Sequence, residues 1–138
     1  MKKILFISGA RPNLIKLAPL YQYFKNKKFF SIKLLHTNQH SDKYLFKNIC
    51  NDLNLNNPDF LINKINAKNN VDMINYFMKK ISKVLDYYKP DCVVIFGDVD
   101  TTLAAGLTAA KKGYFIFHIE AGLRSTESKM QEEINRKI

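Results

Sequence analysis

Long apolar runs are missing from this sequence. No run approaches the roughly 20 residues that a membrane-spanning helix needs. The basic start at residues 1–3 and the apolar residues 4–7 are followed at once by Ser8, Gly9 and Arg11. That interruption comes too soon for the apolar core of a signal peptide. We therefore expect a cytoplasmic protein with no membrane partner.

Cysteine is also scarce, with only Cys50 and Cys92 in 138 residues. The two are not spaced as C-x-x-C and cannot form a metal cluster by themselves. Cys92 lies in an apolar run and Cys50 in an amphipathic segment, which is typical of small buried side chains. No metal site is predicted from them.

Acidic residues are few, with 12 Asp and Glu against 22 Lys and Arg, a formal net charge of +10. Such an excess is found in proteins that bind nucleic acid, anionic membranes or anionic small ligands. The lysines are scattered, however, and are not interleaved with aromatic residues as a base-stacking surface would require. Solvated helix faces explain them better, and we expect no nucleic-acid partner.

Apolar residues make up 46% of the chain and charged residues 25%, as in globular proteins. The pattern predicts a single domain over residues 1–138. Strands are expected at 4–8, 30–36, 60–62, 92–96 and 114–119, and helices at 14–24, 42–53, 71–85, 101–112 and from 132. This alternation predicts an α/β fold: a doubly wound, Rossmann-like parallel sheet with helices on both faces and the short 60–62 strand at its edge.

In such sheets, ligands bind outside the carboxyl ends of the strands. The first of these loops, residues 8–13, leads into a helix N-terminus, where backbone N–H groups and Arg11 suit an anion. It is neither a Walker A loop nor a G-x-G-x-x-G fingerprint, so neither ATP nor NAD is implied. A plain turn with a surface arginine remains the alternative.

Two further strands end in carboxylates, Asp98 and Glu120. Consecutive strands are often neighbours, which would place the two side chains in one cleft, with His118 and Glu120 on the same side of their strand. Carboxylates that share a cleft tend to separate their pKa values, which suits general acid/base chemistry. Arg124 would hold one of them ionised or contact an anionic substrate. The alternatives are loop amides around Asp98 and a structural Glu–Arg pair.

Two more polar groups belong to the same predicted rim. Gln39 and His40 follow the second strand, and Glu132 and Glu133 open the last helix, where acids suit the helix dipole. Each group has a purely structural alternative.

Taken together, five motifs closely resemble the N-terminal half of the non-hydrolysing UDP-N-acetylglucosamine 2-epimerases, over residues 3–136. They are Gly9-Ala10-Arg11-Pro12-Asn13, Gln39-His40, Gly97-Asp98-Val99-Asp100-Thr101-Thr102, His118-Ile119-Glu120-Ala121-Gly122-Leu123-Arg124-Ser125 and Glu132-Glu133-Ile134-Asn135-Arg136. The His-Ile-Glu-Ala-Gly-Leu-Arg stretch is specific on its own. One departure is Gln131, which stands where the family usually has proline.

The resemblance implies a fold like that of the GT-B glycosyltransferases, with the substrate held between two Rossmann-like domains. It implies an isomerase that interconverts UDP-GlcNAc and UDP-ManNAc with no cofactor, neither NAD nor metal. By position, the acid/base carboxylates would be Asp98, Glu120 and Glu132. The substrate-binding residues would be Arg11 near the nucleotide phosphates, Gln39 and His40 near the sugar, and Arg124 and Arg136 beside the site.

The family's second domain has no counterpart in this sequence. The resemblance assigns to that domain most of the uridine and diphosphate contacts and a further catalytic histidine. The chain alone is therefore expected to be inactive, and a C-terminal half supplied in trans or a homodimer are the partners to consider. Two alternatives stay open: the hydrolysing subfamily, and a non-catalytic module of a split GT-B-type protein that needs a partner subunit.

Overall fold

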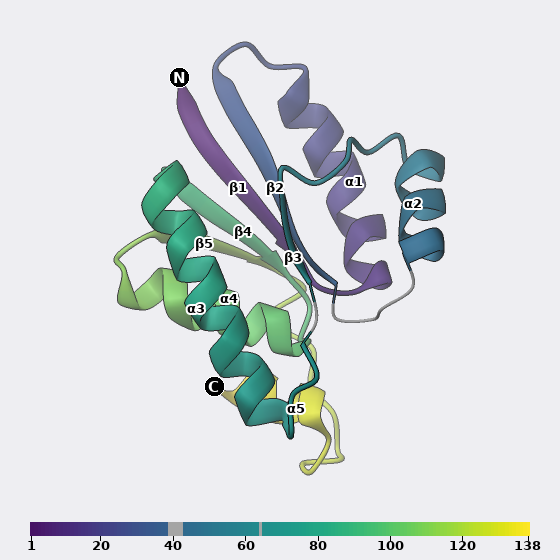
Figure 1. Cartoon of the computed structure of the whole chain (residues 1–138), viewed down its shortest axis with the longest axis vertical. Helices are drawn as coiled ribbons and strands as arrows, with labels where there is room; N and C mark the ends of the chain where they lie inside the picture. The colour runs from purple at the N-terminus through teal and green to yellow at the C-terminus, as the bar shows by residue number, and fades with distance from the viewer. Residues whose placement is uncertain (39–42, 64) are drawn as a thin grey trace.

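A computed structural model describes residues 1–38, 43–63 and 65–138 and contains a parallel β-sheet between two layers of helices (Figure 1). Its described strands follow the order β3-β2-β1-β4-β5. They are β1 (Lys2–Ser8), β2 (Phe30–Asn38), β3 (Phe60–Asn63), β4 (Cys92–Phe96) and β5 (Phe115–Ile119). The expected parallel sheet is confirmed, with the short β3 at one edge.

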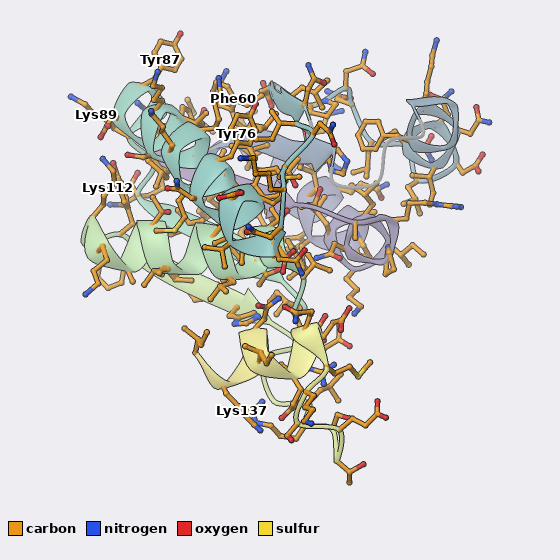
Figure 2. All side chains as sticks on the ribbon, turned by 60° about the horizontal axis from the view of Figure 1, so that its bottom comes forward. Phe60, Tyr76, Tyr87, Lys89, Lys112 and Lys137 are labelled. Atoms are coloured by element: carbon orange, nitrogen blue, oxygen red, sulfur yellow. The ribbon has the colours of Figure 1, made fainter. Side chains whose placement is uncertain are left out.

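Helices cover both faces of the sheet (Figure 1). On one face lie α1 (Arg11–Lys25) and α2 (Lys43–Asp52), and on the other α3 (Asn70–Tyr88) and α4 (Asp100–Lys111). The short α5 (Gln131–Lys137) contacts α4. In Figure 2, Tyr87, Lys89 and Lys112 lie at one end of the molecule, and Lys137 on α5 lies apart from them.

Two hydrophobic cores result from this arrangement because every central strand is apolar on both sides. In β1, Leu5 and Ile7 pack under α3 and α4, whereas Ile4 and Phe6 pack under α1. Phe6 is fully buried and stacks on Phe96 at 6.4 Å between ring centroids. Each such side chain contributes about 1.5–3 kcal/mol of burial free energy.

Local sequence fixes the ends of the longest described helix, α3. Asn69 precedes it, and its side-chain oxygen accepts the backbone N–H of Asp72 at 2.9 Å, which is a standard N-cap. Lys89 follows it in the left-handed conformation with φ 49°, and its N–H donates to Leu85. Pro90 comes next, as is common after a helix end.

The sheet register brings three loops together at the carboxyl end of the strands. Because Phe96 of β4 pairs with Ile119 of β5, the residues that follow each strand adjoin one another. The loop after β1 is equally close to the start of α4: a Cβ added to Gly9 would lie 2.3 Å from Thr101 Oγ1. Among the described helices, none is long and apolar enough to cross a membrane.

Candidate active site

Asp98 is the second residue after β4, and Gly97 before it turns the chain with φ 67°. Arg136 of α5 donates from Nε to Asp98 Oδ2 at 2.8 Å, and its Nη2 donates to the same oxygen. The Arg136 and Asp98 side chains are only 17% and 23% exposed. Because a guanidinium presents its donors in a rigid fork, this contact fixes the direction of the Asp98 carboxylate.

Arg136 is in turn held by Glu133, whose exposure is only 1%. Glu133 Oε2 accepts Arg136 Nη1 at 3.0 Å and the backbone N–H of Ser125 at 2.9 Å. The hydrogen bond from Arg136, supported by that from Ser125, lowers the pKa of Glu133 below its ordinary value. Hydrogen bonds to Glu133 and to Asp98 raise the pKa of Arg136, so Arg136 and Glu133 both stay charged. Glu133 thereby ties the loop after β5 to α5.

Asn135 makes a second connection between α5 and the loop after β4. Its side-chain amide donates to the Asp98 backbone carbonyl at 2.8 Å and to Asp100 Oδ1 at 3.1 Å. Asp100 is buried in the first turn of α4. The short α5 is thus anchored by two consecutive residues, Asn135 and Arg136.

Glu120 lies at the tip of β5 in the left-handed conformation, with φ 65°. A non-glycine residue in that region is uncommon and re-aims the chain as it leaves the strand. The Glu120 carboxylate makes an ion pair with Lys16 of α1, whose side chain is 37% exposed against 30% for Glu120. Helices α1 and α5 therefore each bring a cation to one of the two carboxylates.

His118, near the end of β5, also contacts the loop that carries Asp98. Its Nε2 lies 2.6 Å from the Gly97 carbonyl, a geometry in which the ring N–H donates. His118, Asp98, Glu120 and Arg136 all line one cavity of about 280 Å³ between α4, β5 and α5. The expectation that the two carboxylates share a cleft agrees with this arrangement.

Three other sequence-predicted residues, Arg11, Arg124 and Glu132, do not line this cavity. Arg11 is exposed in the first turn of α1, which has no acidic residue there. Arg124 is exposed, and its guanidinium donates to the loop carbonyls of Ala121 and Leu123 rather than to either carboxylate. Glu132 is half-buried and makes no hydrogen bond or ion pair with the described residues. Gln39 and His40 lie outside the described residues.

A second buried polar group occurs at the carboxyl ends of β1 and β2. His36 is 4% exposed, its Nδ1 lies 2.8 Å from Ser8 Oγ, and Phe46 stacks on its ring. Burial lowers the pKa of His36 to about 4, so the ring is neutral near pH 7. Across the described residues, no three Cys, His, Asp or Glu side chains are grouped as metal ligands.

A family model described as UDP-N-acetylglucosamine 2-epimerase matches residues 22–138 of the chain. The chain belongs to the UDP-N-acetylglucosamine 2-epimerase family. A UDP-N-acetylglucosamine 2-epimerase of Methanococcus maripaludis is 45% identical over 99% of this chain and 36% of the relative. A UDP-2,3-diacetamido-2,3-dideoxy-D-glucuronate 2-epimerase of Pseudomonas aeruginosa is 37% identical over 97% of this chain and 38% of the relative.

Solved structures of the family share the fold. The UDP-GlcNAc 2-epimerase of Methanocaldococcus jannaschii in complex with UDP-GlcNAc and UDP matches with a TM-score of 0.89 and 37% identity. The enzyme of Neisseria meningitidis bound to UDP-GlcNAc matches with a TM-score of 0.88 and 30% identity. The chain covers 37% of each, and 99% and 98% of its own length is matched. It thus corresponds to the N-terminal third of these epimerases.

Sequence reasoning missed the partners that hold the carboxylates in place. It named no partner for Lys16 or Asn135 and explained Glu133 only by the helix dipole. Lys16 lies in the second turn of α1, the helix that begins just after β1 ends. Its nearness to a strand end is the sequence feature that could have indicated a place at the site. For Glu133, the pattern of acids in a first helical turn has an ordinary dipole explanation and so concealed the residue's burial.

Proposed function

We propose that this chain supplies the acid/base part of a UDP-GlcNAc 2-epimerase whose remaining part is provided in cis or in trans. The observation that carries the proposal is the pairing at the strand tips: Asp98 and Glu120 line one cavity, each beside a cation from a different helix. Such fixed carboxylates are what proton transfer at a carbon centre requires.

The reaction requires one proton to leave C2 of the sugar and one to return on the opposite face. A carboxylate removes the C2 proton, the C1–O bond to the diphosphate breaks with its electron pair, and a C1=C2 double bond forms. UDP leaves as the anion. Its phosphate oxygen then adds back to C1, while a carboxylic acid delivers a proton to the other face of C2. Two acid/base groups, one on each face of the sugar, meet this requirement.

We assign these two tasks to Asp98 and Glu120, with Glu132 as a third carboxylate whose approach depends on substrate. Arg136 directs the Asp98 carboxylate, and Lys16 does the same for Glu120. Charges held in place before substrate arrives cost no reorganisation during the reaction, which is why such pairs favour catalysis.

The diphosphate would be met by the loop after β1. Arg11 is exposed there at the N-terminal end of α1, and no acidic residue opposes it in the first turn. The guanidinium suits a phosphate oxygen, and the positive end of the α1 dipole adds to its attraction. Arg124, Gln39 and His40 complete the proposed substrate contacts. Most of the nucleotide would still be bound by the part of the family polypeptide that this chain does not match.

The test is a chimera in which residues 1–138 replace the matching N-terminal third of the Methanococcus maripaludis relative. We expect the purified chimera to convert UDP-GlcNAc to UDP-ManNAc, as measured by NMR, and we expect the isolated chain to show no turnover. Asp98→Asn should reduce kcat by about 10²-fold or more, because a single acid/base group contributes about that much. A folded chimera that turns over neither UDP-GlcNAc nor UDP-2,3-diacetamido-2,3-dideoxy-D-glucuronate would contradict the proposal.

A further inference from the structure

Asn13 is a buried amide at the start of α1 that the proposed reaction does not use. It is the third residue of the helix and is 5% exposed. Its Nδ2 donates to the backbone carbonyl of Phe96, the last residue of β4, at 2.5 Å. Because a carbonyl only accepts hydrogen bonds, this contact fixes which way the amide points. The first turn of α1 is thus joined to the tip of β4.

The Phe96 carbonyl has a second donor and does not depend on Asn13 for its pairing. Thr102, in the first turn of α4, donates from Oγ1 to the same oxygen at 2.6 Å. Helices from opposite faces of the sheet therefore meet at one backbone atom. The next buried residues of α1, Leu14 and Leu17, are apolar. Neither the burial of position 13 nor the need to pair this oxygen explains why an amide stands there.

Asn13 belongs to a closed path of contacts that runs through both strand tips. Gly97, at the tip of β4, donates its N–H to the carbonyl of Ile119 at 3.0 Å, and Glu120 follows Ile119. The Glu120 carboxylate pairs with Lys16, which lies three residues after Asn13 on α1. The path therefore starts and ends on α1. If the Asn13 contact is lost, the start of the helix is free to move relative to Glu120.

The first turn of α1 lacks the side-chain cap that usually secures a helix start. Ala10 precedes the helix and makes no side-chain hydrogen bond to it. On the other side of the contact, Asp98 lies two residues beyond Phe96 and is already held by Arg136. The Asn13 amide therefore joins an uncapped helix start to a strand tip that other residues fix in place.

We propose that Asn13 is a positioning residue, which holds Lys16 at Glu120 by anchoring the first turn of α1 to the tip of β4. Three residues are about one helical turn, so a shift of the helix start moves the Lys16 ammonium with it. Proton transfer tolerates little of this, because a misplacement of about 1 Å can cost roughly 10²-fold in rate. The inference rests on the proposed function for the part that Glu120 plays in the reaction.

Asn13→Leu in the chimera tests this role, because leucine has a similar size and no donor. We expect kcat to fall about tenfold or more, because α1 shifts against the strand tips. The matched control is Thr108→Val, which removes another buried hydrogen bond to a carbonyl, from Thr108 Oγ1 to Ala104 at 2.6 Å within α4. This control should keep kcat within about twofold, because it moves no group of the site. Equal losses of kcat in the two variants would overturn the inference.

A double-mutant cycle separates positioning from a general loss of stability. When Lys16→Met is already present, Asn13→Leu should lower kcat by less than about threefold, because the cation that Asn13 positions is gone. A loss as large as in the Lys16 parent would contradict the inference. Asn13→Ala, which only shortens the side chain, should give the same pattern and replaces Asn13→Leu in the cycle if the leucine variant does not fold.

A spectroscopic measurement on the chain itself needs no turnover. The ammonium NMR signal of Lys16 is assigned as the one that Lys16→Met removes. We expect Glu120→Gln to move this signal in the parent chain, because its ion-pair partner is lost, and to leave it nearly unchanged when Asn13→Leu is present. Equal movements with and without Asn13→Leu, or no movement in the parent, would overturn the inference.

The two kinds of measurement separate this inference from the proposed function. A chimera without turnover, in a protein whose Lys16 signal depends on Asn13, would count against the function and support the positioning role. An active chimera whose kcat is unchanged by Asn13→Leu would leave the function standing and refute the positioning role.

Discussion

Two carboxylates at neighbouring strand tips are each paired with a cation that comes from a distant part of the chain. Asp98 meets Arg136 from α5, and Glu120 meets Lys16 from α1. The proposed chemistry depends on these pairings, because a carboxylate that can swing freely would lose the geometry that proton transfer needs. Substitutions of single residues therefore test the site most directly.

The first such test concerns Lys16. In the chimera, Lys16→Met should lower kcat by about 10²-fold, because it removes a fixed charge from a group proposed to touch substrate. The matched control is Lys112→Met, which breaks the ion pair between Lys112, at the C-terminal end of α4, and Asp86 of α3. Loss of that surface pair should leave kcat within about twofold of the value for the unsubstituted chimera. Equal effects of the two substitutions would remove Lys16 from the site.

His36 gives a second residue-scale prediction, on stability. Its pKa is about 4 in the folded chain against about 6.5 in an unfolded one, so the unfolded state binds more protons between these values. Stability should therefore fall as the pH drops through this window, by about 2 kcal/mol between pH 7 and pH 5 from this group. Urea unfolding at the two pH values measures the loss.

The control for this prediction is His36→Gln, which removes the titrating ring. The variant should lose about 2 kcal/mol less than the parent chain between pH 7 and pH 5, whatever its stability at pH 7. A pH dependence identical in both proteins would show that the ring is solvated.

Asp98 and Glu120 could be predicted from the sequence because each lies within two residues of the end of a mainly apolar strand. Such strands are recognisable without any tertiary information, and their carboxyl ends are where ligands bind. The cations that hold them could not be predicted, since Lys16 and Arg136 depend on how α1 and α5 dock. Side-chain pairing across the fold leaves no periodic pattern in a sequence.

At the scale of whole elements, the close approach of the loop after β1 to α4 is set by Gly9. A Cβ there would lie 2.3 Å from Thr101 Oγ1 and 2.5 Å from Thr101 Cβ. No rearrangement of a flexible side-chain end relieves this contact, because the β-carbon itself is involved. The loop after β1 can lie this close to Thr101 of α4 only while the position remains glycine.

Gly9→Ala should therefore destabilise the chain by about 1–3 kcal/mol, the usual range for overpacking. Gly122→Ala is the matched control, because an added Cβ there meets nothing within 4 Å. Its effect should stay within about 0.5 kcal/mol. Urea unfolding measures the stability of both variants. If the Gly9→Ala chain is as stable as the Gly122→Ala chain, α4 shifts to make room for the added Cβ and the prediction is wrong.

The type of each element and, to within a few residues, its bounds could be predicted, because both depend on the local pattern of apolar and polar residues. The 60–62 strand was predicted from three apolar residues in a polar stretch and is β3 (Phe60–Asn63) at the sheet edge. Strand alternation also placed Glu120 beside His118, and both line the same cavity. The positive φ of Glu120, which turns its carboxylate to Lys16, could not be predicted, since no glycine marks the position.

At the scale of the whole molecule, the sheet is hollowed on each side of β5. The cavity with Asp98 and Glu120 lies on one side, and an apolar groove of about 550 Å³ that Phe115 and Phe117 help to line lies on the other. The chain spans about 36% of the length of the Methanococcus maripaludis relative. The sequence identified the family from its motifs, but an exposed sheet face has no sequence pattern that separates it from a buried one.

The central claim is that this chain moves a proton at C2 of a UDP-sugar, and mass spectrometry in deuterium oxide tests it most directly. The chimera is incubated with UDP-GlcNAc in that solvent, and the mass of the UDP-ManNAc formed is measured. Because the C2 proton leaves and a solvent-derived one returns, we predict product heavier by one deuterium, and almost none with Asp98→Asn or Glu120→Gln. Product formed without deuterium, or undiminished labelling in both variants, would contradict the claim.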